Sequence, residues 1–246
     1  MKKKLVVTSL VIALIAIAVG GTLAYFMDSD EVTNTFTIGS VEIEQIEQQR
    51  KIVADAFTSE LEAFQNDKQL IPVIRNDNAK NDKNFQDKIV TVKNIGKNDA
   101  YVQTYVAVPE VLIDANVLRI YGGTQGGWAT PVEVGTVEES AIVDGSTSTV
   151  KYAVFKYVYN SKLAVGATTT PVIEGVYITQ EADMDVAYDA NGNATSAQFM
   201  MEGKVVVGFD ATQKINVYVA SQAIQERGFA NATTALANFK AHPWAE

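Results

Sequence analysis

The chain contains no cysteine and a single histidine among its 246 residues. The absence of cysteine excludes a disulfide scaffold, a zinc–thiolate centre and a thiol nucleophile. One histidine, His242, cannot supply an HExxH motif or a three-ligand zinc site. Any metal chemistry would therefore depend on carboxylates, which favour calcium or magnesium.

Positive charge is also scarce. The chain has 20 lysines and arginines against 29 aspartates and glutamates, which gives a net charge of −9. Three lysines are the only charged residues before position 25, so the rest of the chain is more acidic than the whole. An acidic body argues against binding to a nucleic-acid backbone. The apolar fraction of 47% is that of an ordinary globular protein with a buried core.

The N-terminus carries a pattern of its own. Three lysines precede an apolar run from Leu5 to Val19, which is shorter than the ~20 residues that a membrane-spanning helix needs. Thr22 and Ala24 then place small residues at the −3 and −1 positions of a cleavage site between Ala24 and Tyr25. The pattern predicts that residues 1–24 are a cleaved secretory signal and that the protein is secreted; an uncleaved signal anchor is the alternative.

The next segment has the alternation of a β-strand. Val32, Asn34, Phe36 and Ile38 alternate with threonines, and Gly39 interrupts the pattern in the manner of a hinge. A strand without a sequence-adjacent partner is a template for pairing with another chain. The stretch 25–43 is therefore predicted to act as a polymerisation strand. The alternative is that residues 32–43 pair within their own domain.

The remaining residues, 44–246, are predicted to form one domain. Apolar residues at helical spacing predict one amphipathic helix from about Glu44 to Asn66. Turn sequences at 93–100 and 189–195 predict hairpins, and Asn231 is the predicted N-cap of a short C-terminal helix. Six β-rich stretches complete the pattern, at residues 88–94, 100–109, 150–160, 170–178, 197–209 and 214–224. The fold class is mainly β, an antiparallel jelly roll or β-sandwich.

Candidate chemical sites are weak. The stretches 181–185 and 189–193 carry oxygen ligands at alternate positions, but Ala194 and Met200 break the EF-hand pattern of the second. The glycine-rich stretch 122–127 lacks the Lys-Ser/Thr of a phosphate-binding loop. A Ser–His–Asp triad would need His242, close to the end of the chain. The sequence thus predicts no catalytic residue, no cofactor and no metal, and indicates a structural or binding protein.

Three stretches carry a resemblance to a known family. The first runs from Gly20 to Ile43 and contains Gly-Gly-Thr, Ala24, an aromatic residue followed by aspartate, and Asn34-Thr-Phe-Thr-Ile-Gly39. The second is VTVKNIGKNDAYVQTYVAVPE, and the third is INVYVASQAIQERGF. Together they resemble the TasA and camelysin group of exported Gram-positive bacterial proteins, over about a quarter of the chain.

The resemblance implies a jelly roll, processing by a SipW-type signal peptidase, and assembly into extracellular biofilm-matrix fibres. In that family each subunit's N-terminal strand is said to complete the sheet of the next. The expected partners are therefore further copies of the chain, the signal peptidase and an accessory anchoring protein, with the membrane involved only before cleavage. Some relatives are labelled metalloproteases, which a chain with one histidine does not support.

Two other classes remain open. A monomeric surface adhesin or accessory protein would bind a saturable ligand, with the Gly122–Gly127 loop as the first place to look. A secreted enzyme with a carboxylate-bound metal, including a camelysin-like metalloprotease, would show an activity that chelators abolish.

Overall fold

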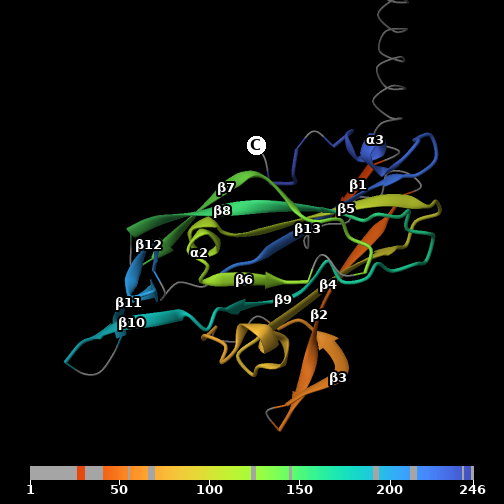
Figure 1. The fold of residues 1–246 in the computed structure, drawn as a ribbon. Helices are drawn as coiled ribbons and strands as arrows, with labels where there is room; N and C mark the ends of the chain where they lie inside the picture. The colour runs from red at the N-terminus through yellow and green to blue at the C-terminus, as the bar shows by residue number, and fades with distance from the viewer. Residues whose placement is uncertain are drawn as a thin grey trace, which may run out of the picture.

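A computed structural model of the chain describes residues 27–30, 41–54, 56–65, 70–122, 126–143, 146–190, 194–210, 215–239 and 241–244 (Figure 1). Over these residues the protein is mainly β, and its strand pairs are antiparallel. None of the described helices is both long and apolar enough to cross a membrane.

Two five-stranded sheets form the body. Sheet A has the order β1–β13–β5–β8–β7. Its strands are β1 Met27–Asp30, β13 Tyr218–Gln225, β5 Ala100–Pro109, β8 Ser146–Val158 and β7 Val132–Val143. Sheet B has the order β3–β2–β4–β9–β6. Its strands are β3 Ala56–Ala63, β2 Ile43–Val53, β4 Gln86–Asn94, β9 Ile173–Ile178 and β6 Leu118–Tyr121.

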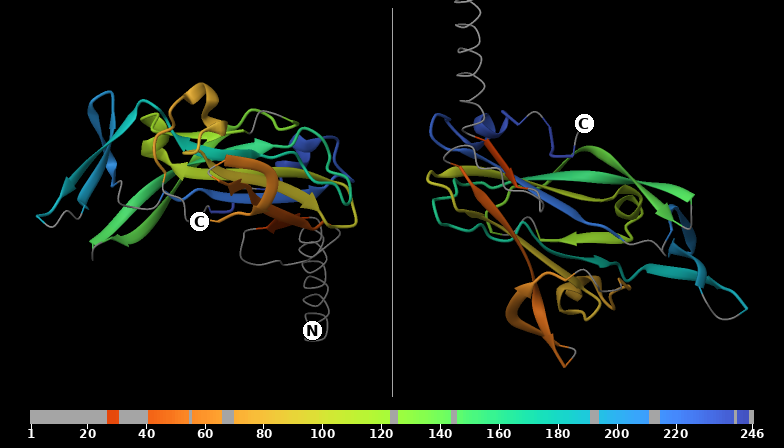
Figure 2. Two further views of the ribbon diagram at one scale, coloured as in Figure 1. Left: turned by 90° about the horizontal axis from the view of Figure 1, so that it is seen from below. Right: turned by 180° about the vertical axis from the view of Figure 1, so that it is seen from behind.

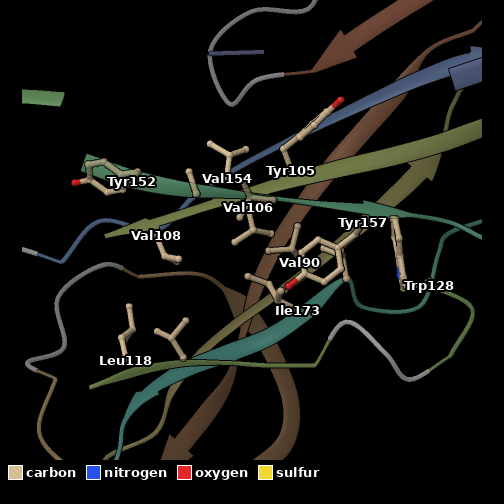
Figure 3. Close-up of a cluster of buried hydrophobic side chains, with 14 of the residues drawn as sticks. Val90, Tyr105, Val106, Val108, Leu118, Trp128, Tyr152, Val154, Tyr157 and Ile173 are labelled. Atoms are coloured by element: carbon tan, nitrogen blue, oxygen red, sulfur yellow. The ribbon is translucent and has the colours of Figure 1, made fainter. Parts of the chain in front are cut away.

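The main core lies between sheets A and B. Val106 and Val108 of β5 point toward Ile173 of β9 and Leu118 of β6, whereas Tyr105 points to the opposite side of sheet A (Figure 3). Strand side chains alternate between the two faces of a sheet, so β5 contributes every second residue to this core. The labelled valines that point into this core, Val90, Val106 and Val108, are fully buried. The β-branched alternation in the sequence therefore marks strands with one face in the core.

Smaller elements extend this body. A three-stranded sheet projects at one end, and the β2–β3 hairpin projects in another direction (Figure 2). Short helices fill connections, and α3 lies against β5 and β13 with Leu236 buried. The remaining elements are η1 Asn76–Asn81, α2 Glu110–Asp114, β10 Ala182–Tyr188, β11 Ala194–Met201, β12 Lys204–Asp210 and α3 Ala232–Leu236.

The predicted helix over residues 44–66 is wrong. These residues form strands β2 and β3, which turn at Ala54, where φ is 49°. Glutamate, glutamine, lysine and alanine favour helix intrinsically, but β2 pairs with β4 over Ile43–Gln48, and tertiary pairing overrides such weak preferences. Two residues of the predicted apolar face, Val53 and Leu61, are about half exposed at 53% and 48%.

The two predicted hairpins have different outcomes. Residues 93–100 do not form a hairpin, because β4 belongs to sheet B and β5 to sheet A. The buried Asn94 side chain holds this crossover: its Nδ2 donates to the carbonyls of Asn98 and Leu163, at 2.8 and 3.0 Å. The second prediction is confirmed, since β10 and β11 pair antiparallel on either side of residues 189–193. The N-cap is also confirmed, with Asn231 Oδ1 accepting the backbone N–H of Thr234 at 2.9 Å.

Candidate functional site: the β13 edge of sheet A

The N-terminal strand β1 occupies the edge of sheet A. It runs antiparallel to β13, with Met27 opposite Ile224 and Asp30 opposite Ser221 (Figure 1). On its other side β13 pairs with β5 over its full length, from Tyr218 to Gln225. β1 therefore covers only half of the β13 edge, and the described part of β1 leaves Tyr218–Ala220 without a strand partner on that side.

The residues of β13 alternate between the core and the outer face of sheet A. Val219 and Ala223 belong to the core between the sheets. Ser221 also points inward, since its hydroxyl donates to Gln45 Oε1 of β2 at 2.8 Å. Ile224 instead packs against α3, and the ring of Tyr218 lies beside that of Trp244. The odd-numbered positions of β13 thus face sheet B.

A polar group from sheet B closes part of this edge. Gln45 Nε2 donates to the backbone carbonyl of Val219 at 3.1 Å, just beyond the point where β1 ends. The Ser221 hydroxyl is also 3.0 Å from the hydroxyl of Thr104, and both residues are fully buried. Buried polar groups with partners fix the geometry around them, so β2, β5 and β13 are held in one arrangement at the edge.

A cavity of about 140 Å³ lies where the chain enters β13. Ile215 and Val217 form one wall of it, and Val176 of β9 forms another. The polar residues at the cavity are Gln86, Lys88 and Asn216, and the other apolar residues are Phe64, Leu70 and Tyr218. The cavity is therefore placed between the two sheets, beyond the described end of β1.

The polar side chains of the cavity differ in whether they have an ionic or hydrogen-bonding partner. Lys88 Nζ pairs with Glu47 Oε2 at 2.5 Å and lies 4.4 Å from the ring centroid of Phe64, in cation–π geometry. Gln86 Oε1 is buried and accepts no hydrogen bond from the described residues. The cavity is therefore lined by the Lys88 ammonium group beside the Phe64 ring and by Gln86, whose amide oxygen accepts no hydrogen bond from the described residues.

The outer face of sheet A is covered by the C-terminal residues 241–244. The rings of Tyr105, His242 and Trp244 form a chain with neighbouring centroids 6.2 Å apart, and Trp244 then meets Tyr218 at 6.5 Å. Burial, together with a 2.5 Å hydrogen bond donated to Glu139, raises the pKa of Tyr218 to about 12. Tyr218 therefore remains a neutral donor at physiological pH.

The side chain of His242 is partly buried and lies beside the rings of Tyr105 and Trp244. Its Nδ1 is buried without a hydrogen-bond partner among the described residues. A catalytic triad needs an acidic group that orients the imidazole, and His242 Nδ1 makes no such hydrogen bond within the described residues. Burial lowers the pKa of His242 below its ordinary value.

This environment predicts a pH effect on stability. The unfolded chain binds a proton at His242 near pH 6.5, whereas the folded chain binds it only at lower pH. Stability should therefore fall as the pH drops below about 6.5. The substitution His242→Phe is expected to keep the ring contacts and remove this component. Urea unfolding of the unsubstituted and His242→Phe proteins at pH 7 and at pH 5.5 measures this pH-dependent part of the stability. An equal loss of stability at pH 5.5 in the two proteins would contradict its assignment to His242.

The carboxylate stretches do not form a metal site in the described part of the chain. No group of three or more histidine, cysteine, aspartate or glutamate side chains is placed there to hold an ion. Glu181 instead accepts two hydrogen bonds from Asn76 Nδ2, at 2.9 and 2.7 Å. Asp183 lies on β10, and Asn191 and Asn193 lie outside the described residues.

The described glycines of the 122–127 stretch are tightly packed. A Cβ on Gly122, where φ is +108°, would lie 2.8 Å from the backbone nitrogen of Glu174. A Cβ on Gly127, which also has a positive φ, would lie 3.1 Å from the ring of Tyr159. These glycines allow close approach of the backbone to neighbouring strands, which is a structural role.

The predicted cleavage and polymerisation residues lie outside the described residues: Ala24, Tyr25, Val32, Asn34, Phe36, Ile38 and Gly39. The segment 25–43 does contribute β1, and its last residues belong to the body, because Val41 and Ile43 are each 1% exposed. The sequence pattern does not reveal Gln45, which falls within the predicted helix 44–66, or the cavity, whose walls come from distant parts of the chain.

Comparison of the chain with protein-family models, with curated proteins and with solved structures gives no match.

Proposed function

We propose that the chain is an exported structural protein whose copies assemble head to tail into fibres, each copy giving its N-terminal strand to the β13 edge of the next. The observation that carries this proposal is the position of β1. This four-residue strand lies at the edge of sheet A, whereas the next described strand, β2, which begins at Ile43, belongs to sheet B.

Such a strand is suited to exchange. Its contacts with the rest of sheet A pass through β13, so the β1 of a second copy could make the same backbone hydrogen bonds in its place. A strand given by one copy and accepted at a different surface of the next forms a head-to-tail contact. Contacts of this type generate filaments when they do not close into a ring.

The register of β1 supports a longer pairing than the one within a single copy. Continued without a shift, it would set position 32 opposite Val219 and position 33 opposite Tyr218, the first residue of β13. The predicted strand Val32–Ile38 is longer than this remaining edge. Its apolar phase also matches, since position 32 would fall opposite an inward-facing residue of β13.

The remaining features are consistent with an exported fibre subunit. The two facing sheets fit the jelly roll that the resemblance to the TasA and camelysin group implies. Removal of residues 1–24 by a SipW-type signal peptidase would free the N-terminal strand from the membrane. Cleavage would then act as the switch for assembly outside the cell.

Negative-stain electron microscopy of two purified chains tests the proposal. The chain that starts at Tyr25 is expected to form filaments, and the chain that starts at Gly39 is expected to remain monomeric because it has no strand to give. The shorter chain still has the β13 edge, so a small proportion of it should cap and shorten filaments of the longer chain. Monomers from both chains under several salt and pH conditions would refute the proposal.

A further inference from the structure

We propose that the cavity at the start of β13 is the pocket that receives Phe36 of a neighbouring copy. This inference rests on the proposed strand exchange, and it names the side chain that would anchor the exchanged strand in the accepting copy. The cavity of about 140 Å³ is lined by Ile215 and Val217, which directly precede β13, and by Lys88 of β4. Its volume is close to the ~150 Å³ of an apolar cavity that binds benzene, and its lining combines apolar residues with Gln86, Lys88 and Asn216.

The β1 register leads to this cavity. Met27 is opposite Ile224 and Asp30 is opposite Ser221, so the same antiparallel register sets position 34 opposite Val217 and position 36 opposite Ile215. Directly opposed residues of an antiparallel pair point to the same face. If the chain continues in this way, Asn34 and Phe36 face inward with Val217 and Ile215.

The reach of the chain indicates that the ring comes from a second copy. Val41 lies two residues before Ile43, and Ile43 is opposite Asn94, at one end of β4. The cavity is lined by Gln86 and Lys88, at the other end of the same strand. From Asn94 to Lys88, the nearer of these two residues, β4 is about 20 Å long at ~3.4 Å per residue. Phe36 lies five positions before Val41, so the chain between them spans at most about 18 Å. This span is shorter than the distance along β4 to the cavity, which favours a ring supplied by a second copy.

This difference gives exchange a driving force. The Met27–Asp30 strand makes the same contacts with β13 in either arrangement, so it does not favour one over the other. A strand from a second copy can continue past Tyr218 and bury an aromatic ring in the cavity. The ring would lie near Phe64 and the Lys88 ammonium group, where cation–π attraction adds to apolar burial.

Disulfide trapping tests the register in the full chain, which has no cysteine of its own. The full chain is expressed with its signal, and the exported protein carrying Asn34→Cys is mixed with protein carrying Val217→Cys under mild oxidation. A covalent dimer is expected, because opposed strand residues lie within disulfide distance. The pair Thr35→Cys with Val217→Cys is the control; its first residue points to the other face, so no dimer should form.

A second measurement tests the cavity itself. Val217→Phe is expected to fill the cavity from within, leave the thermal unfolding midpoint of the monomer unchanged or higher, and raise the critical concentration for filaments about tenfold or more. Phe36→Ala should raise the critical concentration similarly.

The outcomes separate the pocket from the proposed function. Three results would overturn the proposal that the cavity receives Phe36 and leave strand exchange standing. They are filaments without the cross-link, a disulfide formed within one chain that carries both substitutions, and normal assembly of Val217→Phe. The absence of filaments from the unsubstituted protein would overturn both.

Discussion

Replacing Asp87 with alanine is expected to lower the free energy of unfolding by about 3 kcal/mol or more, because it leaves a buried arginine without its counter-ion. The Asp87 side chain is 3% exposed and that of Arg50 is 14% exposed. Asp87 accepts hydrogen bonds from Arg50 Nε at 2.8 Å, from Nη2 at 2.7 Å and from the backbone N–H at 2.7 Å. Such bidentate, charge-assisted pairs are geometrically specific.

The same arginine joins the β2–β3 hairpin to the body. Arg50 Nη2 donates to the carbonyl of Lys80 at 2.6 Å, and its guanidinium lies 3.9 Å from the ring centroid of Phe57 on β3. A second cation–π contact reaches Phe85, at 5.9 Å. Loss of Asp87 should therefore also increase amide hydrogen exchange along β3, in addition to lowering the midpoint of urea unfolding.

An exposed ion pair on the same hairpin provides the matched control. Lys51 and Glu60 lie 3.4 Å apart with side chains 49% and 73% exposed, so Glu60→Ala should change the unfolding free energy by less than about 1 kcal/mol. An Asp87→Ala protein as stable as the Glu60→Ala protein would show that the Arg50–Asp87 pair does not stabilise the fold.

The strands that the sequence predicted correctly are those with one face in the main core. The predicted stretch 100–109 coincides with β5, whose β-branched and aromatic residues alternate between two buried surfaces. The unpredicted strand β7 is an edge strand with three glutamates among its twelve residues, and its alternation breaks at Gly135, where the register with β8 shifts. The 44–66 stretch was misassigned because its composition favours helix, and its pairing partner β4 lies more than twenty residues away.

The candidate site was less predictable than the fold. The sequence indicates that residues 214–224 form a strand, but the neighbours of that strand depend on the order of sheet A. β1 has the sequence MDSD, and aspartate is depleted in strands, so nothing local predicts pairing there. The cavity is formed by Leu70 and by side chains from four separate strands or their flanks, β3, β4, β9 and β13, which no local pattern links.

Replacing both Phe36 and Ile38 with aspartate is expected to abolish filaments and leave the monomer folded. In the extended β1 register Phe36 falls opposite Ile215, on the face that points between the sheets, and Ile38 follows in the same phase. Lys88, which lines the cavity, is already paired with Glu47, and moving a carboxylate from water into such a site without a free partner costs several kcal/mol. Pelleting assays and electron microscopy measure assembly, and the thermal unfolding midpoint of the monomer verifies the fold.

The threonines between these residues provide a control of equal charge. Thr35→Asp with Thr37→Asp adds the same two charges to a protein whose net charge is already −9, but on the face that the register turns away from the core. This variant should still form filaments, with assembly more dependent on salt because the added charges are screened. If both variants lose assembly equally and salt restores both, general repulsion explains the effect, and the inward face of the strand has no specific role. If only the Phe36 and Ile38 variant fails at every salt concentration, burial of those two side chains is what joins one copy to the next.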